Sequence, residues 1–271
     1  MELFDTHCHI HEALRPSKAG TATQRLWARV GNPNPGDILA RAREAGVARM
    51  MCIGTASEDS KLAVQFVQKR ESCWASIGIH PHEAKVHVGD AQALAMFRQL
   101  ARKPKVVAVG ECGLDYYYEH SPKKAQEEIL RFQLDLALQH DLPLVFHVRD
   151  AFDDFWPIFD DYKGLCGVVH SFSATRTELE QALARGLYIG LNGIMTFTKS
   201  DEQLAAAKAV PLDNLLLETD APFLTPAPHR GTICEPRHVR DTAAFLADLR
   251  GESLDTVAHA TTKNARKLFN I

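Results

Sequence analysis

The sequence predicts an α/β protein with the fold of a (β/α)8 TIM barrel. Two observations predict it: eight short apolar segments recur along the 271 residues, and longer segments with helical periodicity lie between them. Strands that alternate with helices pair in parallel through right-handed crossovers. Eight such units in about 250 residues are typical of a closed barrel rather than an open sheet. We therefore expect a single domain over residues 1–271.

The predicted elements alternate along most of the chain. We expect strands at residues 3–9, 48–54, 74–80, 105–111, 142–148, 166–170, 187–193 and 215–220. We expect helices at residues 35–45, 58–70, 90–102, 122–140, 152–162, 176–185 and 201–209. Ser121 and Pro122 suit a helix start, and Gly46 and Gly186 suit helix ends. A last helix near the C-terminus should place Leu268 and Phe269 in the core.

Residues 12–36 are the exception to this alternation. Proline, glycine and asparagine crowd the end of the segment, from Gly31 to Gly36. These residue types favour turns over helices and strands. We therefore expect a long loop over the mouth of the barrel.

Composition limits the function. The net charge is −3 and the isoelectric point is near 6.5, so no global basic field is available to wrap long duplex DNA. Any contact with nucleic acid should be local. The six cysteines contain no CxxC pair, and four of them (8, 52, 112 and 166) lie in strand-like segments, which predicts reduced, structural thiols. Neither a signal peptide nor a membrane-spanning segment is evident. We expect a cytoplasmic monomer.

Ligand-type residues stand at the ends of the predicted strands. His7 and His9 lie two positions apart, so a strand would direct both rings to one face. The other strand ends carry His80, Glu111, His147, His170 and Asp220. Any one of them could instead be a packed histidine, a helix cap or a turn residue. Barrel enzymes, however, place their chemistry at the carboxyl ends of the strands.

Together these residues predict a metal centre. Four histidines (7, 9, 147 and 170) and two carboxylates (Glu111 and Asp220) are enough ligands for two divalent ions that share a water. Glu111, on a middle strand, is the natural bridge. His80 lies outside this set, and we expect it to support the ligands or to bind a substrate phosphate.

The segments that carry these residues resemble the motifs of one known family. They are DTHCH at 5–9, GIHP at 78–81, GECGLDYY at 110–117, LVFHVRDA at 144–151, HSFS at 170–173 and LETDAPFL at 217–224. In this order they resemble the motifs of the TatD family, over essentially the whole chain. That family consists of metal-dependent TIM-barrel hydrolases of the amidohydrolase superfamily. Its characterised members are deoxyribonucleases, several of them 3'-5' exonucleases.

The resemblance implies an assignment of ligands. It places His7, His9, Glu111 and Asp220 around one metal, and Glu111, His147 and His170 around the other. The chain departs from the family pattern in its long segment 12–36 and at Cys234, where the family commonly has asparagine before Glu-Pro. Both departures border the barrel mouth, so they concern substrate choice more than metal binding.

Other residues are candidates for binding the substrate. Arg149 follows His147 by two positions, which predicts a shared face and a phosphate contact. A salt bridge with Asp150 or another acid is the alternative. Tyr116, Tyr117 and Tyr118 could stack on a base or pack internally. A basic cluster at 229–240 could add local positive charge or simply begin a helix. The remaining histidines have no readable partner spacing, and we expect them in solvent: 11, 82, 87, 120, 140, 229, 238 and 259.

The resulting hypothesis is a deoxyribonuclease with two divalent cations (Mg, Mn, Zn or Co) acting on DNA ends or short single-stranded nucleic acid. Asp220 would accept the proton of the attacking water and Glu111 would bridge the metals, while Arg149 and His80 would bind the phosphate. An amidohydrolase-type enzyme that cleaves a C–N or ester bond, such as an aminoacyl-tRNA deacylase, would use the same ligands. Eight strands disfavour a PHP-type phosphoesterase, and a binding module would instead have closed metal coordination.

Overall fold

The computed structural model describes residues 2–31 and 33–271. The eight strands pair in the order of the chain, from β1 to β8, and the registers that are defined are parallel. The architecture is the (β/α)8 barrel that the sequence predicts. The strands are β1 (Leu3–Cys8), β2 (Val47–Ile53), β3 (Cys73–Ile77), β4 (Val106–Asp115), β5 (Leu144–Arg149), β6 (Gly167–Val169), β7 (Tyr188–Leu191) and β8 (Leu215–Leu217).

The chain divides into two compact units. Unit 1 comprises the residues up to 52, 171–267 and 271, and unit 2 comprises residues 53–170 and 268–270. A single domain over residues 1–271 stays a prediction. In the described part of the chain, no helix combines the length and the apolar character needed to cross a bilayer.

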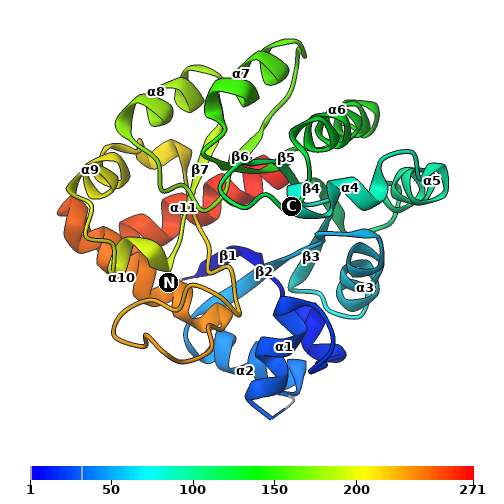
Figure 1. The fold of residues 1–271 in the computed structure, drawn as a ribbon. Helices are drawn as coiled ribbons and strands as arrows, with labels where there is room; N and C mark the ends of the chain where they lie inside the picture. Colours follow the sequence, from blue (N-terminus) through cyan, green and yellow to red (C-terminus); the bar gives the residue numbers. More distant parts are fainter. Residues whose placement is uncertain (1, 32) are drawn as a thin grey trace. The chain divides into compact units, whose positions relative to one another are not determined.

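Unit 2 contains β3 to β6 and the helices packed on them. Figure 1 shows α3 beside β3 and α6 beside β4. Phe146 of β5 lies with its ring centroid 5.1 Å from that of Phe155 and 5.7 Å from that of Phe159, so aromatic packing holds α7 on β5. The helices are α3 (Ser57–Gln68), α4 (Ala84–His87), α5 (Ala91–Leu100), α6 (Lys123–His140) and α7 (Phe152–Asp160), and a 3-10 turn, η2 (Pro81–Glu83), precedes α4.

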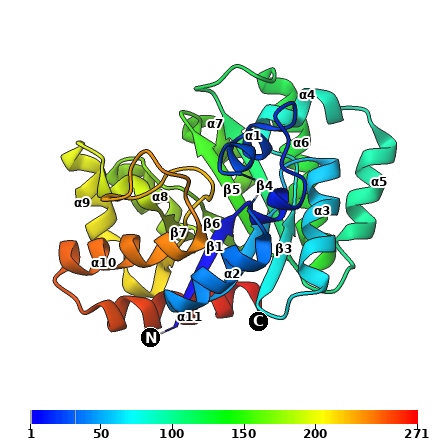
Figure 2. The same cartoon turned by 90° about the horizontal axis from the view of Figure 1, so that it is seen from below.

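Unit 1 contains β1, most of β2, β7 and β8. Cys8 forms a parallel bridge with Ala221, so the segment that follows β8 lies beside the end of β1. Figure 2 shows α10 beside β1, against which it packs. The helices are α1 (Ala22–Arg29), α2 (Pro35–Glu44), α8 (Arg176–Ala184), α9 (Asp201–Ala209), α10 (Val239–Arg250) and all but the end of α11 (Leu254–Phe269). Short 3-10 turns are η1 (Ile10–Leu14), η3 (Gly193–Thr196), η4 (Leu212–Asn214) and η5 (Pro236–His238).

The prediction of an unbroken loop at 12–36 is wrong, because α1 lies within it. The Thr21 hydroxyl accepts a hydrogen bond from the Gln24 backbone at 3.1 Å and caps the helix. Trp27 is fully buried, and its indole N–H donates to the His9 carbonyl at 3.1 Å. The prolines and glycines at the end of the segment led to the prediction of a loop, although an amphipathic helix lies in the middle of the segment. Asn32 lies outside the described residues.

Strand β4 runs four residues past its predicted end at Glu111, to Asp115. It passes through Gly110 and Gly113, whose φ angles of 143° and 148° disfavour other residues. A Cβ at Gly113 would clash with the carbonyl oxygen of His147. Glycine therefore lets β4 and β5 approach closely at the level of His147.

The six cysteines, all among the described residues, are in no disulfide, and five of them are buried. Cys166 is the exception: it is exposed and directly precedes β6, which begins at Gly167. The prediction that Cys166 lies inside a strand is therefore wrong, since β6 has only three residues.

We predict that Trp27→Ala destabilises the protein by about 3–5 kcal/mol, because it leaves a large cavity and removes the hydrogen bond to the His9 carbonyl. Denaturant unfolding followed by circular dichroism would measure the loss. Arg29→Ala, an exposed change on the same helix, is the control and should cost less than about 0.5 kcal/mol. Equal stability of the two variants would show that α1 contributes little to the fold.

Candidate metal centre

Unit 1 carries a cluster of two imidazoles and one carboxylate. His7, in β1, and His9, directly after it, have ring centroids 5.2 Å apart. Their Nε2 atoms lie 3.6 and 3.3 Å from Oδ1 of Asp220. The His7 and His9 side chains are 0% and 6% exposed, whereas that of Asp220 is 19% exposed. The carboxylate is therefore the solvent-facing member of the cluster.

Backbone hydrogen bonds hold Asp220 opposite the two histidines. Its amide donates to the His7 carbonyl at 2.8 Å, and the His9 amide donates to the Ala221 carbonyl at 2.7 Å. These bonds join the end of β1 to the chain that follows β8. His7 and Asp220 are more than 200 residues apart in the sequence, so only the pairing of these segments brings them together.

Asp5 supports the same junction from inside the unit. Its carboxylate accepts hydrogen bonds from the amide and the hydroxyl of Thr219, at 2.9 and 2.7 Å. Burial raises the pKa of Asp5 to about 8, although the hydrogen bonds from Thr219 and His7 oppose that shift. The sequence reasoning did not consider Asp5, but its spacing two residues before His7 was a usable signal, because it places both side chains on one face of β1.

Sequence reasoning also missed Glu218. It is buried, and its Oε1 accepts hydrogen bonds from the Ser171 amide at 2.6 Å and from the Asn192 side chain at 3.4 Å. Gly190 leaves room for this carboxylate, because a Cβ there would clash with it. Glu218 thus holds the start of the segment after His170 by hydrogen bonds that no sequence spacing indicates.

Unit 2 carries a second cluster, centred on the carboxylate of Glu111. Its Oε1 lies 2.8 Å from Nδ1 of His147, 3.1 Å from Nε2 of His170 and 3.4 Å from Nε2 of His80. Glu111 belongs to β4 and is nearly fully buried. Three imidazoles from other parts of the unit therefore converge on one buried oxygen.

Asp115 orients the imidazole of His147 from the other side. Its Oδ2 lies 2.9 Å from Nε2 of His147 and 3.0 Å from Nε2 of His82. Sequence reasoning missed Asp115 because the strand was expected to end at Glu111. Four further residues of β4 carry the chain on to Asp115, and this even spacing directs both carboxylates to one face.

The electrostatics of the unit 2 cluster favour an ionised Glu111. Burial alone would raise the pKa of this carboxyl, but the imidazoles of His170, His80 and His147 hold it well below its usual range. Burial lowers the pKa of His147, and its hydrogen bonds with Asp115 and Glu111 outweigh burial and raise it. His147 therefore tends to carry a proton that a cation could replace.

His80 has a different protonation state. Burial lowers its pKa to about 4 against the opposing effect of Glu111, so the ring is neutral. Its Nδ1 accepts the backbone N–H of His82 at 3.1 Å. A neutral ring that accepts at Nδ1 carries its proton on Nε2, the nitrogen that faces Glu111. His80 is thus a hydrogen-bond donor at the cluster.

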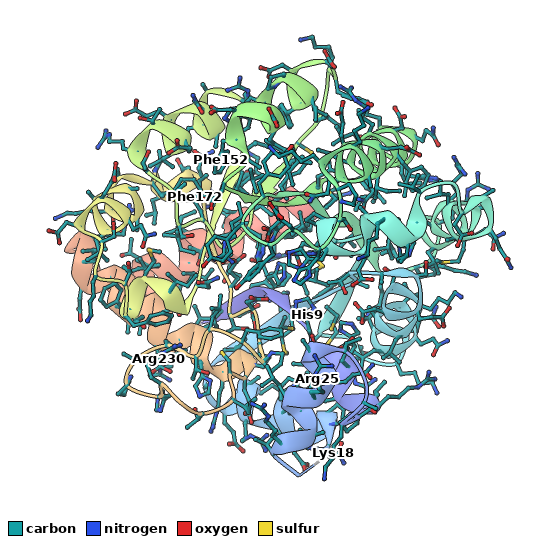
Figure 3. The ribbon with its side chains drawn as sticks, in the orientation of Figure 1. His9, Lys18, Arg25, Phe152, Phe172 and Arg230 are labelled. Carbon is teal, nitrogen blue, oxygen red and sulfur yellow. The ribbon has the colours of Figure 1, made fainter. Side chains whose placement is uncertain are left out.

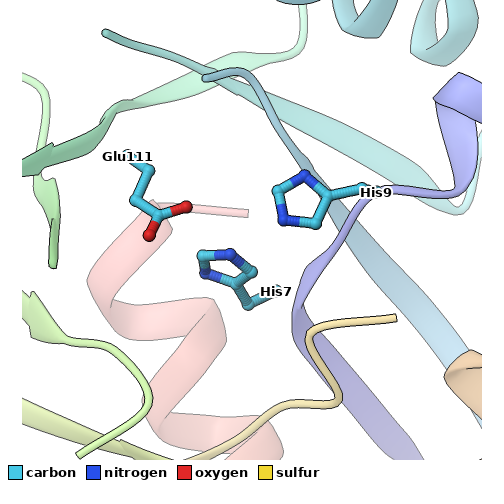
Figure 4. Close-up of side chains that lie close together, drawn as sticks. All are labelled: His7, His9 and Glu111. Atoms are coloured by element: carbon cyan, nitrogen blue, oxygen red, sulfur yellow. The ribbon is translucent and has the colours of Figure 1, made fainter. Parts of the chain in front are cut away.

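Both clusters fit a divalent cation. Ligand atoms about 2.1 Å from an ion lie roughly 3.0–3.4 Å from one another in tetrahedral or octahedral coordination, close to the distances from the carboxylate oxygen to the imidazole nitrogens in each cluster. Figure 4 draws the side chains of His7 and His9 from unit 1, together with Glu111 from unit 2. Imidazole nitrogen and carboxylate oxygen suit zinc, manganese, cobalt or magnesium. The donor chemistry of each cluster therefore suits a divalent cation, and the assignment of individual ligands stays a prediction.

Arg149, at the exposed end of β5, lies on an aromatic surface. Its guanidinium carbon is 3.9 Å from the ring centroid of Tyr117 and 4.9 Å from that of Tyr118. Among the described residues, Arg149 forms no ion pair with a carboxylate, so the salt bridge considered as an alternative does not occur. The guanidinium is held by cation–π contact.

The basic segment at 229–240 is engaged within unit 1. Arg230, labelled in Figure 3, lies over the ring of Phe197 at 3.7 Å, and Arg237 pairs with Glu235 at 3.2 Å. Arg25 of α1, outside this segment and also labelled in Figure 3, donates to the Gly20 carbonyl. Because Arg230 and Arg237 make local contacts, the segment 229–240 is a poor source of a free positive surface.

Three histidines expected in solvent are buried: His11, His87 and His238. His87 lies 2.8 Å from the Glu83 carbonyl and 2.9 Å from the Ser57 hydroxyl. These partners satisfy the ring: Glu83 lies one helical turn before His87, whereas Ser57 is 30 residues away and no sequence spacing indicates it. His238 is also hydrogen-bonded, since its Nδ1 accepts the backbone N–H of Glu235 at 3.0 Å.

Cys234 lies beneath the turn that carries Asp220. It is buried, and its amide donates to the Pro222 carbonyl at 3.1 Å. Burial raises the pKa of this thiol well above its usual range, and the nearby Asp5 and Asp220 carboxyls add to the shift. Cys234 is therefore a neutral packing residue in this unit.

A model of one protein family matches nearly the whole chain. The family is described as TatD related DNase, and the match covers residues 4–270. An uncharacterized metal-dependent hydrolase of Bacillus subtilis, YabD, is 32% identical over 271 residues, or 99% of each protein.

Further similarity comes from a named exonuclease and a solved structure. The 3'-5' ssDNA/RNA exonuclease TatD of Erwinia tasmaniensis is 38% identical over 245 residues, covering 86% of this chain and 93% of its own. The crystal structure of YJJV, a TatD homolog from Escherichia coli K12, superposes with a TM-score of 0.85 at 29% identity and covers 99% of this chain and 98% of its own.

We predict that Asp115→Asn lowers the affinity for divalent metal roughly 10- to 100-fold, because the charge that orients His147 is lost. Titration calorimetry with Mn²⁺ or Zn²⁺ would measure it. Asp153→Asn, an exposed change at the start of α7, is the control and should bind as the parent does. Unchanged affinity in Asp115→Asn would mean that His147 needs no carboxylate partner.

Proposed function

Because the chain belongs to the TatD family of metal-dependent hydrolases, we propose that it is a deoxyribonuclease of the 3'-5' exonuclease type. The observation that carries the proposal is that each unit surrounds a carboxylate oxygen with imidazole nitrogens, at separations of 2.8 to 3.6 Å. A relative that is 38% identical is named a 3'-5' ssDNA/RNA exonuclease. We propose a cytoplasmic monomer that acts on DNA ends or short single strands, and cysteines that are in no disulfide are compatible with a reducing compartment.

We propose that each cluster binds one divalent cation. In unit 1 the ion would be held by His7, His9 and Asp220. In unit 2 it would be held by Glu111, His147 and His170.

Two ions bound there would supply a water that is acidic enough to attack at neutral pH, and positive charge beside the phosphoryl oxygens. Asp220 would accept the proton of that water at Oδ1. Its partial exposure supports this role, since the proton must then pass to solvent. Glu111 is buried among three imidazoles, which suits a ligand rather than a base.

Arg149 and His80 would bind the phosphate of the substrate. The Arg149 guanidinium has no carboxylate partner among the described residues, so its N–H groups remain available to an anion. His80 presents a proton on Nε2 near Glu111. Hydrogen bonds from these two residues would orient the scissile phosphate and stabilise the charge that develops on it.

The decisive experiment is hydrolysis of an end-labelled single-stranded oligonucleotide before and after chelation, with metal content measured by mass spectrometry. We expect shortening from the 3' end, loss of activity with chelator and recovery with a divalent cation. Aminoacyl-tRNA is the comparison substrate. Deacylation of that tRNA without oligonucleotide shortening would refute the nuclease and support an amidohydrolase-type reaction instead.

We predict that Asp220→Asn largely retains metal while the turnover number falls about 10²- to 10⁴-fold. Asparagine keeps the size and one ligating oxygen but cannot accept a proton, and a positioned general base contributes about this factor. Single-turnover hydrolysis together with metal analysis would measure both quantities.

His7→Ala is the matched comparison, because it removes a ligand of the same cluster. We expect it to lose metal and activity together. Near-normal turnover in Asp220→Asn would show that the base lies elsewhere, and His80 would then be the next residue to test.

A further inference from the structure

Two exposed tyrosines follow β4 in unit 2, on the segment that connects β4 to α6. Tyr117 and Tyr118 are 57% and 43% exposed. Their rings meet edge to face with centroids 4.7 Å apart. Tyr118 also stacks on His120, with centroids 5.7 Å apart and planes 22° apart. Adjacent exposed aromatic rings offer an accessible π surface on which a flat ligand can stack.

Arg149 completes this surface. Its guanidinium lies 3.9 Å from the centroid of the Tyr117 ring, and the residue is itself exposed. A guanidinium that lies on an aromatic ring keeps its outer face and N–H edges open. We name Tyr117, Tyr118 and Arg149 the stacking platform.

Hydrogen bonds fix the platform relative to the Glu111 cluster. Oδ1 of Asp115 accepts the backbone N–H groups of Tyr117 and Tyr118, at 3.0 and 2.9 Å. Oδ2 of the same carboxylate lies 2.9 Å from Nε2 of His147, whose other ring nitrogen faces Glu111. One carboxylate therefore connects the platform backbone to a proposed metal ligand, and the platform is held before any ligand arrives.

Hydrogen bonds from helix α6 also hold this segment in place. The side-chain oxygen of Gln126, on α6, accepts the Asp115 amide at 2.8 Å, and its nitrogen donates to the carbonyls of Asp115 and Ser121. The Tyr116 amide donates to the Arg149 carbonyl at 3.0 Å. A pre-organised segment loses little conformational entropy when a ligand binds.

We propose that the stacking platform binds an unpaired base of single-stranded nucleic acid, next to the metal ligands of unit 2. The proposal rests on the proposed nuclease function and names the part of the substrate that this segment recognises. A base has a flat π face that stacks on tyrosine rings or on a guanidinium plane. The N–H edges of Arg149 remain free for the adjoining phosphate.

This chemistry selects single strands. Both faces of a base inside a duplex are covered by its neighbours, so only an unstacked base can lie on the platform. Stacking is tolerant of sequence because every base has a π face. The platform would therefore help a chain with a net charge of −3 to retain a nucleic-acid substrate.

The test measures binding without hydrolysis. A fluorescein-labelled single-stranded oligonucleotide is titrated with the protein in excess chelator and followed by fluorescence anisotropy. Tyr117→Leu should raise Kd roughly 5- to 150-fold, the usual effect of losing one stacked base. Tyr117→Phe keeps the ring and should bind as the parent does. Arg149→Lys keeps the charge but loses the flat face, so it should also weaken binding.

Two controls separate stacking from other effects. Tyr162→Leu, at a half-buried position just after α7, should leave Kd unchanged, and circular dichroism checks that each variant is folded. Oligonucleotides with an abasic site at successive positions supply the matched change in the ligand. One abasic position should weaken binding to the parent but not to Tyr117→Leu, because the two changes remove the same contact.

The platform is refuted if Tyr117→Leu binds like the parent, or if the Phe and Leu variants lose affinity equally. Duplex DNA that competes as well as the single strand would also overturn it. Platform-dependent binding without cleavage after metal is restored would refute the nuclease but keep the platform. Cleavage with an unchanged KM in Tyr117→Leu would refute the platform but keep the nuclease.

Discussion

The buried carboxylate of Glu111 is the group on which the arrangement of unit 2 depends. An ionised carboxyl removed from water is costly unless positive or hydrogen-bonding groups surround it. Here the compensation comes from His80, His147 and His170, whose ring nitrogens lie 2.8 to 3.4 Å from one oxygen. Strands and loops must bring these side chains to one point, which makes the cluster a constraint on the fold as well as a place for cations.

Asp115 connects the Glu111 cluster to the segment that follows β4. This carboxylate has partners on both of its oxygens: imidazoles on one, and the backbone of the tyrosine segment on the other. The exposed rings of Tyr117 and Tyr118 are therefore held by the same charge that orients His147. In unit 1, Asp5 has a comparable role. Its carboxylate joins β1 to Thr219 by hydrogen bonds, and this places Asp220 beside His7 and His9.

Much of this could be read from the sequence. Periodicity identified all eight strands, and the order of strands and helices indicated a barrel. Because side chains alternate along strands and barrels place ligands at one end, the strand ends also predicted a set of metal ligands, and that assignment stays a prediction: His7, His9, Glu111, His147, His170 and Asp220. Helix α1 was not predicted because the prolines and glycines near it indicate a loop. The helix cap at Thr21 and the apolar Trp27 were the signals that could have indicated a helix.

The sequence by itself determined the element order and the residue types available at the strand ends, since both follow from local periodicity. Only the tertiary structure decided which partners those residues have. Asp115 lies at the cluster because β4 continues through two glycines, His87 lies beside the hydroxyl of Ser57, 30 residues away in the chain, and Arg149 lies on tyrosine rings rather than beside an acid. These outcomes depend on distances between segments remote in the chain, and the balance of burial, charge and stacking at each point is set only when those segments meet.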